Sequence, residues 1–81
     1  MYTLTDRYVF AVYVTGIDPS GAYEDRLYEA GCDDATIVVR DGEMHLNFER
    51  EAPAFSDAVG AALRDIERAG GRVLRVERIE G

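Results

Sequence analysis

The sequence predicts an α+β fold in which a four-stranded antiparallel sheet carries two helices on one face. Three patterns indicate this. A strand-like run with two apolar faces lies near the start of the chain, an Asp-Gly hairpin lies near its middle, and a helical apolar stripe precedes the last strand-like run. The chain has 81 residues, so we expect a single domain over residues 1–81.

The first strand is predicted at Tyr8–Val14, which reads YVFAVYV. Aromatic and β-branched residues favour strands, and apolar side chains on both faces indicate a central place in the sheet. After the loop TGIDPSG, a helix is predicted at Ser20–Ala30, capped by Ser20 or Asp18. Gly31 stands where a helix commonly ends in the left-handed conformation. The apolar stripe of this helix is formed by Tyr23, Leu27 and Ala30.

Two further strands are predicted at Ala35–Arg40 and Glu43–Phe48. Asp41 and Gly42 join them, and Asp-Gly is a strong signal for a two-residue hairpin. The second of these strands alternates, so we expect one sheet face to be covered by the helices and the other to be partly wet. The covered face takes Met44, Leu46 and Phe48, and the other takes Glu43, His45 and Asn47.

A second helix is predicted to begin near Pro53 and to end at Gly70 and Gly71. The run RVLRVERI at residues 72–79 predicts a last strand at the sheet edge, because charged side chains discourage stray pairing. The resulting order, with right-handed crossovers, predicts a ferredoxin-like βαββαβ sandwich whose first and third strands are central. The stripe of the second helix is formed by Phe55, Val59, Ala62, Leu63 and Ile66.

The chain is strongly acidic. Sixteen Asp and Glu residues stand against nine arginines and no lysine, which gives a net charge of −7. Such a charge repels nucleic acids and anionic membranes and attracts basic surfaces. No apolar stretch reaches the roughly 18 residues that span a membrane, no signal segment follows Met1, and one cysteine forms no internal disulfide. We therefore expect a protein of the bacterial cytoplasm with no direct nucleic-acid or membrane partner.

The stretch EAGCDDA, residues 29–35, is the part of the sequence that most resembles a reactive site. A cysteine nucleophile needs a base such as histidine, and His45 is predicted on the sheet face away from the helices. Cys32 follows a helix C-terminus and precedes Asp33 and Asp34, and negative charge makes a thiol less reactive. We expect Cys32 to pack as a small apolar residue, and we predict no catalytic residue, no metal and no cofactor. An enzyme that uses Cys32 and His45 is the weakest hypothesis.

The acidic residues concentrate in the first part of the chain. Residues 1–34 hold seven acids and two arginines, a net charge of −5, whereas residues 72–81 hold two acids and three arginines, a net +1. The simplest interpretation of each acid is a solvated surface position. As a set they predict a docking patch for a basic protein surface. The predicted partner-binding residues are Glu24, Asp25, Tyr28, Glu29, Asp33 and Asp34.

The open sheet face offers two other interpretations. Tyr8, Phe10 and Tyr13 are rings on which nucleobases could stack, but the net charge and the few arginines of residues 72–79 favour protein binding instead. The same face, with Val9, Ala11 and Tyr13, could pair with a second copy. A monomer and a homodimer both stay open.

The words LYEAGCDDA, LNFEREA, AVGAALRDIE and RVLRVE resemble an accessory domain of small bacterial proteins, where it precedes a helix-turn-helix DNA-binding segment. The resemblance covers Tyr8 to Glu77. No helix-turn-helix follows in this sequence, so the resemblance implies protein association rather than DNA reading. A small, acidic chain of this kind is also similar to phage-encoded anti-CRISPR proteins, which implies a CRISPR surveillance complex as partner.

We therefore predict a non-enzymatic, anti-CRISPR-like inhibitor that blocks the nucleic-acid-binding surface of a CRISPR effector or a similar partner. The alternative is a regulatory or oligomerisation module that binds a sibling bacterial protein through its sheet face.

Overall fold

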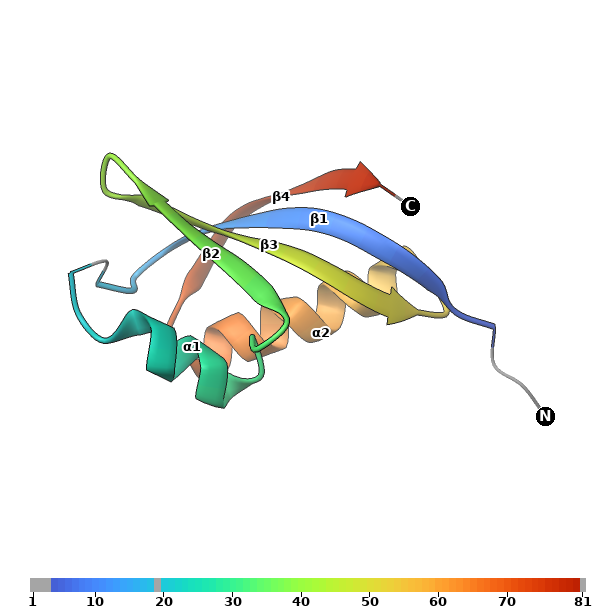
Figure 1. Cartoon of the computed structure of the whole chain (residues 1–81), viewed down its shortest axis with the longest axis horizontal. Helices are drawn as coiled ribbons and strands as arrows, with labels where there is room; N and C mark the ends of the chain where they lie inside the picture. The colour runs from blue at the N-terminus through green and yellow to red at the C-terminus, as the bar shows by residue number, and fades with distance from the viewer. Residues whose placement is uncertain (1–3, 19, 81) are drawn as a thin grey trace.

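The computed structural model describes residues 4–18 and 20–80 and confirms the predicted fold class. Two helices lie on one side of a four-stranded antiparallel sheet (Figure 1). The element order is that of a ferredoxin-like βαββαβ fold. The elements are β1 (Asp6–Thr15), α1 (Tyr23–Ala30), β2 (Ala35–Arg40), β3 (Glu43–Ala52), α2 (Phe55–Arg68) and β4 (Arg72–Glu80).

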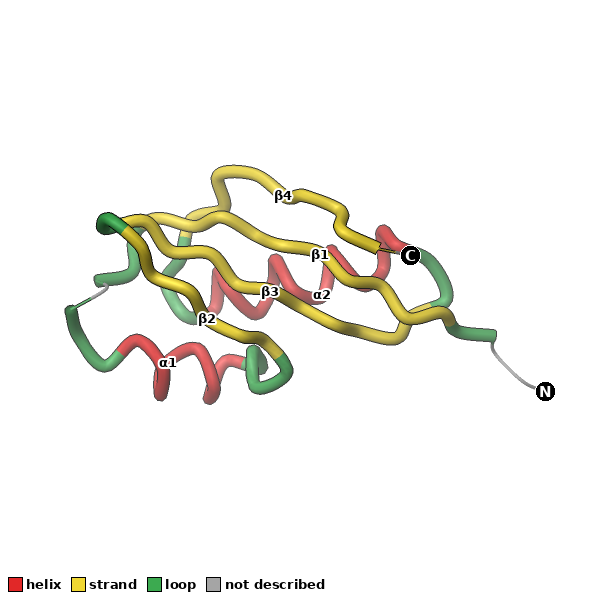
Figure 2. The backbone as a smooth tube through the Cα atoms, turned by 45° about the horizontal axis from the view of Figure 1, so that its top comes forward, coloured by secondary structure: helices red, strands yellow, loops and turns green. Residues whose placement is uncertain are grey.

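The sheet has the strand order β2-β3-β1-β4, so β1 and β3 are central and β4 is an edge, as the sequence predicts (Figure 2). β1 pairs antiparallel with β3 along one side and with β4 along the other. Phe10 lies opposite Phe48 in the first of these pairs, and their rings stack at 5.4 Å between centroids. The central strands therefore supply the largest side chains of the core.

The core lies between the sheet and the two helices. Its side chains follow the expected periods: every second residue of β1 and β3 points toward the helices, and Leu27 and Ala30 of α1 point back. The residues predicted for the apolar stripe of α2 differ in burial: Ala62 and Ile66 are buried, whereas Phe55 is only half-buried. The largest fully buried side chains are Phe10, Phe48, Leu27, Leu46, Ile66 and Val12.

The first helix begins later than predicted, at Tyr23 rather than Ser20. Asp18 does not cap the helix, because its Oδ1 accepts two hydrogen bonds from Ser20. The backbone N–H of Ser20 donates at 2.9 Å and the hydroxyl of Ser20 donates at 2.7 Å. These bonds hold the pair in a turn, and the N-terminal residue Ala22 has no side-chain cap. The predicted capping role of Asp18 or Ser20 is therefore wrong.

Several strands are longer than predicted. β1 begins at Asp6 and β3 continues to Ala52, because Asp6 lies opposite Ala52 and the ladder stays regular between these ends. The added residues are largely charged and carry no apolar alternation that the sequence pattern could use.

Candidate functional site

The predicted acidic residues of α1 lie on its solvent side. Leu27 and Ala30 face the core, and the helical period leaves Glu24, Asp25 and Glu29 exposed. Tyr28 is 66% exposed among them, which is unusual for a large ring. α1 thus presents carboxylates together with one aromatic side chain that has no apolar cover.

A shallow hollow of about 250 Å³ runs between α1 and the edge strand β2. Tyr28 and Asp33 line it together with Glu24, so three of the six predicted residues lie around one surface feature. Ile37 of β2 and the neighbouring Ala35 supply its apolar side. The hollow gives a partner side chain a place to pack beside the carboxylates.

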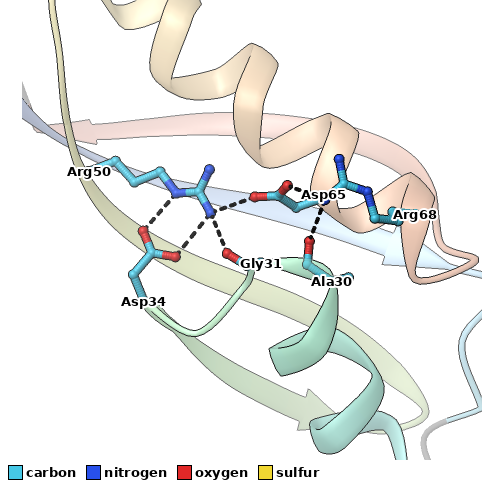
Figure 3. A network of polar contacts seen from close by, with 6 residues as sticks. All are labelled: Ala30, Gly31, Asp34, Arg50, Asp65 and Arg68. Carbon is cyan, nitrogen blue, oxygen red and sulfur yellow. Dashed lines mark hydrogen bonds and ion pairs between the residues drawn. The ribbon is translucent and has the colours of Figure 1, made fainter.

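Asp34 does not line this hollow, and it differs from the other predicted residues because it is ion-paired within the chain. The Arg50 Nε donates to Asp34 Oδ2 at 2.7 Å and its Nη2 donates to Asp34 Oδ1 at 3.0 Å, a two-pronged ion pair (Figure 3). The charge of Asp34 is therefore neutralised within the chain. The role of Asp34 in partner binding stays a prediction, since its side chain is still 35% exposed, whereas Asp33 is exposed and has no ion pair within the described residues.

We define the acidic face as the five remaining predicted residues. Four of them are carboxylates, and within the described residues 4–18 and 20–80 no arginine lies within ion-pair distance of these four. The chain therefore leaves this charge available for another molecule. The members of the acidic face are Glu24, Asp25, Tyr28, Glu29 and Asp33.

Arg50 joins three segments that are distant in the sequence. Besides Asp34, its Nη2 donates to Asp65 Oδ2 of α2 at 3.0 Å and to the backbone oxygen of Gly31 at 3.1 Å. Its side chain is only 13% exposed. Burial alone would lower the pKa of Arg50, but the hydrogen bonds that Arg50 donates to Asp34 and Asp65 outweigh burial and raise its pKa, so the guanidinium stays charged.

Sequence reasoning missed this arginine, although a signal was present. Arg50 continues the alternation of Leu46 and Phe48, so the period of β3 points it toward the helices. A guanidinium on a core-facing position requires buried acceptors. The alternation of β3 therefore predicts a polar network around Arg50, but it does not identify the acceptors, which lie far away in the sequence.

The network also holds the end of α1. Arg68 donates from Nη1 to the backbone oxygen of Ala30 at 3.3 Å and lies 3.7 Å from Asp65 Oδ1 (Figure 3). The last turn of α1 has no basic residue of its own, so Arg50 and Arg68 supply the positive charge that a helix C-terminus favours. A helix of eight residues is marginal alone, and these contacts fix the acidic face relative to the sheet.

The structure places Cys32 and His45 on opposite sides of the sheet. Cys32 is 3% exposed and belongs to the core between sheet and helices, as expected. His45 lies on the open face, where its ring is 4.9 Å from that of Tyr13. Burial, and next the Asp65 carboxylate, raise the pKa of the Cys32 thiol to about 11. The side chains do not form a nucleophile–base pair.

We predict that the thiol of Cys32 is unreactive in the folded protein. A pKa near 11 instead of 9.0 leaves about 100-fold less thiolate at pH 8, and burial slows attack further. Alkylation by iodoacetamide, followed by mass spectrometry, should be at least about 100-fold slower in the native protein than in guanidinium chloride. A native rate equal to the denatured rate would contradict this prediction and favour the enzyme hypothesis.

The open face does not offer the predicted stacking rings. Tyr8 and Phe10 point into the core, where both pack against Phe55, so neither can stack on a nucleobase. Tyr13 does lie on the open face, but the guanidinium of Arg75 covers its ring at 4.1 Å. The suggestion of three rings on this face is therefore wrong for two of them.

Within residues 4–18 and 20–80, no group of three or more His, Cys, Asp and Glu side chains could hold a metal ion. In the same part of the chain, no helix is long and apolar enough to cross a membrane. Comparison with protein-family models, with curated proteins and with solved structures found no significant match. The acidic face is therefore the feature of this molecule that bears most directly on function.

Proposed function

We propose that this protein is a non-enzymatic inhibitor that docks its acidic face on the basic nucleic-acid-binding surface of a CRISPR effector or a similar partner. The observation that carries the proposal is the uncompensated charge of the acidic face. Arg50 and Arg68 neutralise Asp34 and Asp65, but within the described residues no arginine pairs with Glu24, Asp25, Glu29 or Asp33. The CRISPR effector is the partner class implied by the resemblance to anti-CRISPR proteins.

The acidic face has two parts with different roles. Exposed carboxylates attract a basic surface over several ångströms and mainly raise the association rate and specificity. Affinity requires desolvated apolar contact, which Tyr28 and the hollow beside Ile37 provide. A partner with arginine or lysine side chains around a small apolar group fits this combination.

We predict that charge reversal on the acidic face weakens partner binding. The test variant is Asp25→Lys/Glu29→Lys/Asp33→Lys, and its association rate with a purified CRISPR effector should fall by about tenfold or more at low salt. Binding is measured by biolayer interferometry over a salt series. The wild-type rate should fall steeply with salt, and the rate of the variant should change little.

The matched control is Glu43→Lys/Glu51→Lys/Glu67→Lys, which changes the net charge equally at exposed positions outside α1. The control should retain most of the wild-type association rate. Equal losses in both variants would show that only total charge matters. Unchanged binding in the test variant would exclude the acidic face, and no binding of the wild type to any CRISPR effector would exclude that partner class.

The alternative, a module that binds a sibling protein through its open sheet face, is less well supported. Ala11 is already buried, Tyr13 lies under Arg75, and Glu49 pairs with Arg7 across the same face. Among the described residues these contacts bring charged groups onto this face, whereas face-to-face pairing of two sheets buries apolar side chains.

A further inference from the structure

The outer edge of β4 is a second candidate interaction surface. β4 and β2 are the two edge strands, so this surface lies at the edge of the sheet opposite β2. β4 pairs only with β1 within the described residues, so the backbone groups along its other side have no strand partner there (Figure 2). Leu74 is 63% exposed and Ile79 55% exposed at the two ends of this edge. An edge with exposed apolar residues can accept another strand.

Only the middle of β4 is regular. Register shifts against β1 fall next to Leu74 and Ile79, whereas Arg75, Val76, Glu77 and Arg78 pair in unbroken order with residues 13 to 10. Along this regular stretch, Arg75 and Glu77 point to the open face and Val76 points toward the helices, opposite Val12 of the core. A strand docking here meets a short, regularly paired stretch with a defined side-chain pattern.

We propose that this edge pairs antiparallel with β4 of a second copy of the chain, about a two-fold axis at Val76. In this register Arg75 lies opposite the partner's Glu77, and Glu77 lies opposite the partner's Arg75. Opposite charges across neighbouring strands stabilise an antiparallel pair, and like charges directly opposite destabilise it. The intrachain ion pair between Arg75 and Glu77, at 3.2 Å, would extend into a cluster of two arginines and two glutamates.

The charges also exclude the neighbouring registers. In a symmetric antiparallel pair, opposite residues share a face of the sheet, so the axis passes between two copies of one residue, and the nearest alternatives to Val76 are residue 75 and residue 77. The first places Arg75 opposite the partner's Arg75, and the second places Glu77 opposite the partner's Glu77. The arginines that we expected to discourage stray pairing thus also specify one self-complementary alignment.

An apolar groove lies beside this edge. It has a volume of about 460 Å³, and its lining includes Phe55, Val59 and Leu63 of α2 and Val76 of β4. The three α2 side chains stand at helical spacing and are only half-buried in one copy. A two-fold axis perpendicular to the sheet keeps all four helices on one face and brings the two grooves together, which covers these side chains.

The distribution of charge permits this pairing in spite of the net charge of −7. Residues 72–81 carry a net charge of +1, and the acidic face lies beside β2 at the other edge of the sheet. The two acidic faces of the proposed dimer therefore lie at its opposite ends, where salt screens the repulsion between them effectively. This inference uses a different surface from the proposed function and does not depend on it.

The test is a charge swap read by sedimentation equilibrium. The wild type should show a dimer of the 9.0 kDa chain. Each single variant, Arg75→Glu and Glu77→Arg, should weaken the dimer by about tenfold or more, because like charges then meet twice. The double variant Arg75→Glu/Glu77→Arg should return to within about threefold of the wild-type dissociation constant. Circular dichroism verifies that each variant is folded.

The control Arg40→Glu makes the same charge change on the edge strand β2 and should leave the dimer intact. A wild type that stays monomeric at millimolar concentration overturns the proposal. A dimer that ignores the single variants, or that the double variant does not restore, also overturns it. Such a dimer uses another surface, such as the open face or a contact between β4 and the acidic face.

Site-specific cross-linking provides a second measurement that requires no loss of binding. In a Cys32→Ser background, Val76→Cys places one thiol at the proposed axis, and a short bis-maleimide should join two copies efficiently. Thr36→Cys on β2 serves as the control and should give at least about tenfold less cross-linked dimer, since the β2 edges lie far apart in this arrangement. Equal yields from the two positions would contradict the proposal.

Discussion

Replacing Arg50 with methionine is expected to lower the free energy of unfolding by about 2–3 kcal/mol. Methionine keeps most of the apolar stem that lies against Phe48 but removes every hydrogen bond of the guanidinium. Asp65 is only 19% exposed at its side chain and would keep just the longer contact to Arg68. Removing one partner of a largely buried pair leaves the other charge uncompensated, and this is the main cost.

Urea unfolding followed by circular dichroism measures the effect of Arg50→Met, and the melting temperature should fall by about 10–20 °C for a domain of this size. The matched control is Arg7→Met, which removes an arginine of the adjacent strand that pairs with Glu49 on the surface. Both of those side chains are more than half exposed, so the control should cost less than about 0.5 kcal/mol. Equal costs in the two variants would show that the network around Arg50 adds nothing beyond a surface ion pair.

Replacing Gly31 with alanine should cost about 3 kcal/mol, from two separate sources. Its φ of 113° lies in a region that L-residues rarely adopt. A Cβ at this position would also stand 2.8 Å from Cγ of Asp65, closer than Cβ atoms approach other groups. Arg50 and Arg68 hold that carboxylate, so it cannot move away without weakening the network.

Gly70→Ala separates the two sources. Gly70 also has a positive φ, of 93°, but an added Cβ there meets no atom within 4 Å, so only the backbone strain of about 1–2 kcal/mol is expected. In an Asp65→Ala background, the cost of Gly31→Ala in free energy of unfolding should fall to a similar value, because the carboxylate that the added Cβ would meet is absent. Chemical denaturation of the four variants completes the comparison. A cost that stays at about 3 kcal/mol without the Asp65 carboxylate would contradict the explanation.

The sequence was sufficient for the fold because its periodic patterns agree with one another. The alternation of β3, the two apolar faces of β1 and the Asp-Gly hairpin each specify a local structure, and only one arrangement buries them all. The start of α1 was predicted too early because Ser20 has the right chemistry for a cap but is bound to Asp18. The residue types alone do not show whether Ser20 caps the helix or donates its hydrogen bonds to Asp18.

The candidate site was only partly predictable for a related reason. Exposure of Glu24 and Asp25 follows from the helical period of α1, which is local information. Whether a carboxylate is free or neutralised depends on tertiary contacts. Asp33 and Asp34 are adjacent and chemically identical, yet only Asp34 meets Arg50, sixteen residues away. The period of β3 places Arg50 on the covered face but does not specify the turn that it reaches.

The central position of β1 has a consequence for how the chain folds during synthesis. β1 is synthesised before the other three strands, but one of its two neighbours is β4, the last of the four to be synthesised, and Val9 lies opposite Glu80. The nascent chain can form the contacts of β1 with β3, yet the second side of β1 is covered only after β4 has been synthesised. Closing so long a loop is slow compared with local helix formation. Until then one edge of β1 has no strand partner, and an unpaired apolar strand of this kind is prone to pair with other extended segments.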